Sequence, residues 1–138
     1  MRPLLFLFFQ LTFLNCFSQN TLVKNDTIQR EENVMLYLDN GFSVTPFAVS
    51  GEIYLTNELF IFHPKRYRKK RFDMYHDLMK DVILPYDSIV LAKRKGVFNL
   101  KLMTMSKKYK ISYSNNWGKG LKSTITEIRS RMKEHTLR

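Results

Sequence analysis

Apolar and polar residues alternate through the middle of the chain. Ile53 and Leu55 stand two positions apart, and Phe60 and Phe62 do the same after the turn-forming run Thr56-Asn57-Glu58. A period of two places every second side chain on one face of a strand, so that one face packs on a core and the other meets water. This region is therefore predicted to form two antiparallel strands with a shared buried face.

Further strands are predicted toward the C-terminus. Residues 98–102 and 109–113 alternate in the same way, and Lys101 is expected to face outward. Pro46 cannot donate a ladder hydrogen bond, so it predicts a sheet edge or a bulge. Residues common in tight turns predict hairpin connections at three places: Asn40-Gly41, Lys95-Gly96 and residues 105–107.

The last part of the chain changes to a helical period. Leu121, Ile125, Ile128 and Met132 recur three or four positions apart, which is the apolar stripe of an amphipathic helix. The helix is expected over about residues 117–135, with Asn115 or Asn116 as its N-cap. Many short strands followed by one helix predict a mainly β fold. We expect a partly open antiparallel barrel or sandwich that the C-terminal helix caps.

The N-terminal residues 1–18 are interpreted as a signal peptide. Arg2 is followed by an apolar run, and Cys16 and Ser18 are small residues that fit cleavage after Ser18. The run is shorter than the roughly 20 residues of a membrane-spanning helix. An uncleaved N-terminal anchor and lipid attachment at Cys16 are the alternatives. Cleavage predicts export to the periplasm, the cell surface or the medium.

The remaining chain divides into a lead-in and one domain. Residues 19–32 are polar and are predicted to be a flexible lead-in, whereas 33–138 are predicted to form the folded domain. The chain has 138 residues, a formal net charge of +11 and one cysteine. A single cysteine excludes an intramolecular disulfide framework and a zinc site built on cysteines.

A dense basic segment interrupts the predicted strands, in an insertion at about residues 64–81. Its cations are separated only by Tyr67. Near an anionic membrane each Lys or Arg contributes about 1 kcal/mol of attraction, which salt screens. The segment is therefore a candidate site for an anionic surface or lipid; the alternative is a solvated loop without a ligand. The candidate residues are Lys65, Arg66, Arg68, Lys69, Lys70 and Arg71.

The order of three segments resembles the GRAM domain, a member of the pleckstrin-homology-like superfold. The first runs from Gly51 to Pro64 and contains the turn Leu55-Thr56-Asn57; the second runs from Ile83 to Ile89. The third is the strand 109–113 with the helix that follows it. Together these segments extend over roughly residues 34–135. The resemblance implies a seven-stranded sheet with a capping helix that binds lipids or proteins, without catalytic residues or a cofactor.

Export separates this chain from GRAM domains, which are best known on proteins inside cells, so phosphoinositide binding is not carried over. The main hypothesis is an exported, non-enzymatic binding domain for an anionic surface or lipid. The alternative is a protein-interaction module that uses a sheet edge or the groove beside the C-terminal helix. The basic, aromatic-containing segment would also suit nucleic acid, but an exported protein meets little of it.

No residue pattern indicates catalysis. His63, His76 and His135 fit no Ser-His-Asp arrangement, and Asp73, His76 and Asp77 match no strong metal-binding spacing. No metal or cofactor is expected. Trp117, the only tryptophan, is interpreted as an anchor that holds the helix on the barrel, and Met103 and Met105 as packing residues.

Overall fold

The computed structural model describes residues 26–38, 47–65 and 80–137. The predicted signal peptide, the Asn40-Gly41 turn, Pro46 and the basic residues from Arg66 to Arg71 lie outside the described residues. Among the described residues, no helix is both long and apolar enough to cross a membrane.

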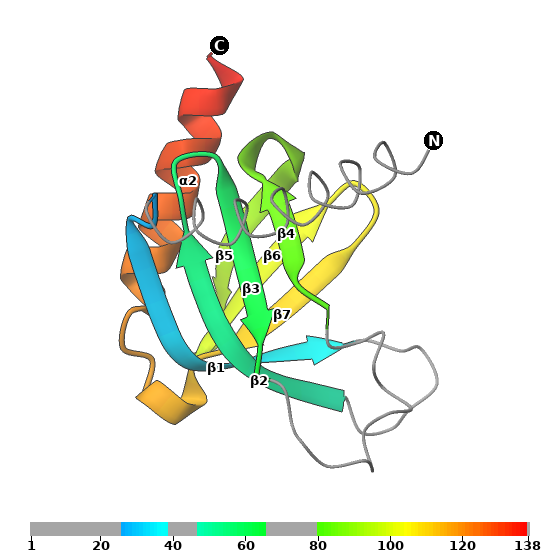
Figure 1. Cartoon of the computed structure of the whole chain (residues 1–138), viewed down its shortest axis with the longest axis vertical. Helices are drawn as coiled ribbons and strands as arrows, with labels where there is room; N and C mark the ends of the chain where they lie inside the picture. The colour runs from blue at the N-terminus through cyan, green and yellow to red at the C-terminus, as the bar shows by residue number, and fades with distance from the viewer. Residues whose placement is uncertain (1–25, 39–46, 66–79, 138) are drawn as a thin grey trace, which may run out of the picture.

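Seven antiparallel strands form one sheet in the order β4-β3-β2-β1-β7-β6-β5 (Figure 1). The central strand β1 (Gln29–Leu38) pairs with β2 on one side and with β7 on the other. The remaining strands are β2 (Phe47–Leu55), β3 (Leu59–Pro64), β4 (Val82–Pro85), β5 (Ile89–Lys95), β6 (Asn99–Thr104) and β7 (Lys108–Ser112).

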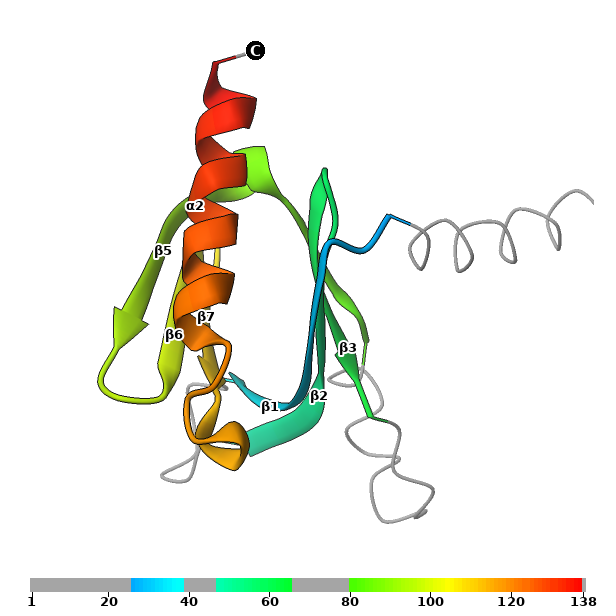
Figure 2. The same cartoon turned by 90° about the vertical axis from the view of Figure 1, so that its left-hand side faces the viewer.

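The sheet folds over on itself, so that β2 and β3 stand opposite β5 to β7 (Figure 2). Helix α2 (Leu121–Thr136) lies along the opening between these two halves. Short 3-10 turns, η2 (Tyr86–Ser88) and η3 (Ser114–Asn116), precede β5 and α2 respectively. The predicted fold class, mainly β with one C-terminal helix, is confirmed.

Local sequence patterns placed most elements correctly. Ile53, Leu55, Phe60 and Phe62 are all buried in one core, as the alternation predicted. The turn at Thr56 is stabilised by its own side chain, because its hydroxyl accepts the backbone N–H of Leu59 at 2.9 Å. The hairpins at Gly96 and at residues 105–107 also form where they were predicted.

Helix α2 docks through its predicted stripe. Leu121, Ile125 and Ile128 are buried in the core, and Met132 packs against it. The hydroxyl of Tyr113 donates to Thr124 Oγ1 at 3.0 Å and ties the helix to the end of β7. Burial raises the pKa of Tyr113 well above its usual range, so this phenol stays protonated.

The predicted start of the helix was wrong. Helix α2 begins at Leu121, and its N-cap is Gly120, which makes no side-chain capping bond. Asn116 is directed elsewhere, since its side-chain amide donates to the backbone oxygen of Glu32. Gly120 has a φ of 81°, and a Cβ there would collide with the carboxylate of Glu31. A contact with distant β1 therefore selects glycine before the helix.

Candidate functional site

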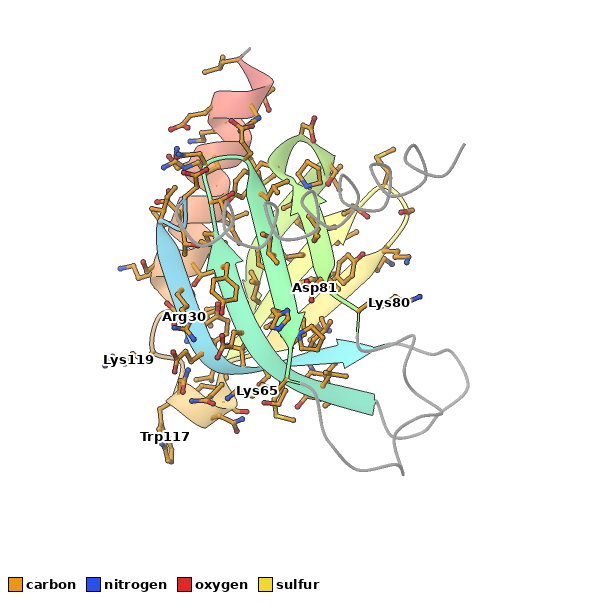
Figure 3. All side chains as sticks on the ribbon, viewed as in Figure 1. Arg30, Lys65, Lys80, Asp81, Trp117 and Lys119 are labelled. Atoms are coloured by element: carbon orange, nitrogen blue, oxygen red, sulfur yellow. The ribbon has the colours of Figure 1, made fainter. Side chains whose placement is uncertain are left out.

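Lys65 is the first residue of the basic segment and lies at the end of the sheet strand β3 (Figure 3). It follows β3 directly, and its backbone N–H donates to the oxygen of Ser50 on β2 at 2.8 Å. Its ammonium group donates to Oδ1 of Asn33 at 2.6 Å. Of the six candidate cations, Lys65 alone is among the described residues, so the grouping of all six remains a prediction.

Asn33 lies in a bulge of β1. The pairing of β1 with β2 shifts between Glu31 and Val34, and Asn33 has a φ of 56°. Asparagine tolerates this left-handed conformation better than most residues. The bulge presents its side chain to Lys65.

Charged side chains beside Lys65 are paired with one another. Arg30 lies 3.0 Å from the carboxylate of Glu52 and 3.1 Å from that of Glu32. The hydroxyl of Tyr54 donates to the same Glu52 oxygen at 2.5 Å, and the Arg30 guanidinium stands 5.5 Å from the Tyr54 ring centroid. This network satisfies its own charges and leaves Arg30 poorly suited to capture an external anion.

The network also sets the protonation of Glu52. Burial favours the neutral acid, but the bonds from Tyr54 and Arg30 and the nearby positive charges of Arg30 and Lys65 outweigh it. The pKa of Glu52 therefore lies below its ordinary value. Burial and the same carboxylate raise the pKa of the Tyr54 phenol, which keeps it a hydrogen-bond donor.

The two described histidines contact carboxylates. His63 Nδ1 on β3 lies 2.7 Å from Oδ1 of Asp81, the residue before β4. His135 lies 3.6 Å from Glu58 and stacks at a tilt against buried Tyr86, with 5.9 Å between ring centroids. In the described part of the chain, no group of three His, Cys, Asp or Glu residues gathers as metal ligands. His76, Asp73 and Asp77 lie outside it.

The interpretation of Trp117 as an anchor was wrong. Its side chain is 88% exposed, and it projects from the lower end of the molecule in Figure 3. Trp117 has a φ of 51°, and the next residue, Gly118, has a φ of 72° and lies beside Phe98. Two consecutive left-handed residues turn the chain toward α2 and direct the indole away from the core. Met105 is likewise not a packing residue, because its side chain is 91% exposed.

A second group of cations was not predicted from the sequence. Strands β5, β6 and β7 present Lys93, Lys101 and Lys110 at directly opposed positions. Lys95 lies two positions after Lys93 on β5, and Lys108 lies two positions before Lys110 on β7, so each shares the face of its neighbour. We call these five residues the lysine face. The sequence contains one sign of this group: no Asp or Glu occurs between Ser88 and Thr126.

The sheet edges fit the protein-interaction alternative poorly. The carbonyl oxygen of Ala92 on edge strand β5 accepts a bond from Arg129 of α2 at 2.8 Å. The opposite edge strand, β4, has four residues and ends in Pro85. Both features hinder the addition of a partner strand. A shallow depression beside α2 is lined by Gly118, Gly120, Lys122, Ser123, Thr126 and Glu127.

Comparison with solved structures identifies the fold. The chain superposes on the Vps36 N-terminal PH domain with a TM-score of 0.57 and 13% identity, over 81% of this chain and 82% of that one. It also superposes on the C-terminal domain of an unknown protein from Leishmania infantum, with a TM-score of 0.52 and 11% identity, over 77% and 83% of the two chains. By sequence, no protein-family model and no curated protein matches the chain. The fold is thus PH-like.

Proposed function

We propose that this protein is an exported, non-enzymatic, GRAM-like binding module that docks on an anionic lipid surface. The contact is made by the basic segment that starts at Lys65 and continues through Arg71. One observation carries the proposal: Lys65 is held at the end of β3 by Ser50 and Asn33, so the segment starts from a fixed position on a rigid sheet.

Charge supports an anionic partner. The whole chain carries a formal net charge of +11, and six cations fall within residues 65–71. Such a segment repels itself, and an anionic surface relieves that repulsion. In contrast, the neighbouring Arg30 is already paired with Glu32 and Glu52, so the attraction falls to the segment itself.

Vesicle co-sedimentation tests this proposal. The chain is mixed with neutral phosphatidylcholine vesicles and with vesicles that also contain phosphatidylserine, at low and moderate salt. Neutral vesicles control for insertion of the apolar residues 1–18. We expect selective binding to the anionic vesicles that weakens steeply with salt.

A substitution series identifies the residues responsible. Arg66, Arg68, Lys69, Lys70 and Arg71 are changed to Gln, while Lys65 is kept because it contacts Asn33. This variant should lose about a hundredfold or more in affinity for anionic vesicles. Unchanged affinity would contradict the assignment of the site to the segment.

Export is part of the same proposal and has a separate test. Mass spectrometry of the protein recovered outside the cytosol should show a chain that begins at Gln19. Recovery of the intact N-terminus would favour the anchor instead, and a lipid adduct on Cys16 would favour a lipoprotein.

A further inference from the structure

The lysine face places like charges directly opposite one another, which is normally unfavourable in a sheet. Lys101 of β6 pairs with Lys93 of β5 on one side and with Lys110 of β7 on the other. Directly opposed side chains on neighbouring antiparallel strands have Cβ atoms about 5 Å apart, and like charges at that separation destabilise the sheet. Three positive charges therefore stand in one row across three strands.

No acidic side chain relieves this repulsion within the three strands. Strands β5, β6 and β7 contain no Asp or Glu. Among the described residues, one contact stabilises the row: the Lys110 ammonium lies 4.7 Å from the ring centroid of Tyr37. Locally unfavourable arrangements of this kind are expected at functional sites, where a ligand supplies the missing interaction. The missing interaction here is an extended negative charge.

The neighbouring β6–β7 hairpin adds an apolar tip. Met105 is 91% exposed between Thr104 and the basic residues Lys107 and Lys108. The turn is well defined, since Thr104 N–H donates to the Lys107 oxygen at 2.9 Å and Lys107 N–H donates to Thr104 Oγ1 at 3.1 Å. A rigid turn thus holds an apolar side chain in solvent at the border of the lysine face.

We propose that the lysine face and Met105 form a second membrane-docking surface, in which the lysines attract anionic phospholipid head groups and Met105 enters the interfacial layer. The choice of an anionic membrane as the partner rests on the proposed function, but the residues differ from those of the basic segment. An apolar tip with flanking cations suits an anionic bilayer because the two contributions add.

The composition of this surface favours a bilayer over nucleic acid. All five cations are lysines, which act as point charges and lack the planar fork with which Arg recognises a single phosphate group. Single-stranded nucleic acid needs aromatic rings on which bases stack, and Tyr37 is already covered by Lys110. An exposed Met at the tip has no use in binding phosphates.

The two proposed surfaces are connected through the sheet. Lys65 is bonded to Ser50, which pairs with Met35, which in turn pairs with Ser112. The same row continues from Ser112 through Asn99 to Lys95 of the lysine face. One cross-strand row therefore links the start of the basic segment to the second surface.

The test uses the same vesicle assay with three variants of the whole chain. The first changes Lys93, Lys101 and Lys110 to Gln. The matched control makes the same change at Lys119, Lys122 and Lys133, which are exposed on or beside α2. The third is Met105→Ser, which keeps every charge. Thermal unfolding of each variant verifies that it folds.

We expect the lysine-face variant to bind anionic vesicles at least about tenfold more weakly, and the matched control to change by less than about threefold. Met105→Ser should weaken the binding that persists at moderate salt, because that part does not depend on charge. Equal losses in the lysine-face variant and its control would overturn the inference, since net charge alone would explain them. An unchanged affinity of Met105→Ser, together with competition by a single-stranded oligonucleotide, would assign the face to nucleic acid instead.

The experiment separates failure of this inference from failure of the proposed function. Loss of binding in the basic-segment variant alone would support the proposed function and overturn the second surface. Loss in the lysine-face variant alone would do the reverse. No binding of the unmodified chain to anionic vesicles would reject both.

Discussion

The two halves of the sheet differ in how their charged side chains are paired. On β1 and β2, Arg30, Glu32, Glu52 and Tyr54 form a connected network in which every charge has a partner. On β5, β6 and β7, lysines face lysines. Both halves bury the same core, so burial of apolar side chains does not require the difference. Paired charges stabilise the first half, whereas the lysines of the second form no ion pair with a described residue, which is why we propose that an external anion meets them.

The largest expected effect comes from the core that both halves share. Ile128 of α2 is fully buried in that core. Ile128→Ala should lower the free energy of unfolding by about 2 to 4 kcal/mol, because it leaves a cavity between the halves. Denaturant unfolding measures this change, with the exposed Thr126→Ala as control. Separate transitions for the two halves would show that they do not fold as one unit.

The paired half should lose stability when one of its charges is removed. Glu52→Gln should cost about 1 kcal/mol at neutral pH, because the hydrogen bonds from Tyr54 and Arg30 are weakened. The exposed Asp87→Asn is the control. An equally stable Glu52→Gln protein would remove the basis for calling this network stabilising.

Acid should reveal the same network. The folded-state pKa of Glu52 lies below its ordinary value of 4.5. Its contribution is therefore complete above pH 4.5 and is lost as the pH falls through the lower, folded value. Denaturant midpoints measured at successive pH values should fall less steeply in Glu52→Gln than in the unmodified chain. Parallel curves would contradict the assignment.

Removing a charge from the lysine face should raise the stability of the fold rather than lower it. Lys101→Gln removes the central charge of the row and should raise stability by about 0.5 kcal/mol at low salt. Added salt should shrink the gain. Lys133→Gln removes the same charge from the last turn of α2, where it is favourable, and should give no gain. A destabilised Lys101→Gln protein would mean that the row is not repulsive.

No loss of stability is expected at Trp117. Because its side chain is 88% exposed and its φ is 51°, Trp117→Gly should leave stability unchanged or raise it by up to about 1 kcal/mol. Thermal unfolding followed by circular dichroism measures this without relying on the lost indole. A clear loss of stability would restore its role as an anchor.

The sequence by itself determined strands β2, β3, β6 and β7, the turns at Thr56 and Gly96, and the buried stripe of α2, but not the central strand β1. These features depend on the period of apolar residues and on side chains that bond their own backbone, which are local properties. The basic segment was equally visible, since six cations in seven residues need no structure to be noticed.

Only the tertiary structure decided which side chains meet across long distances in the chain. Glu31 selects Gly120 before α2, Asn33 holds Lys65, and the register of β5, β6 and β7 aligns Lys93, Lys101 and Lys110. A shift of one residue in the register of β5, β6 or β7 would turn its lysines inward. Register follows from how the whole sheet closes on its core, and that closure is a property of the folded chain rather than of any one segment.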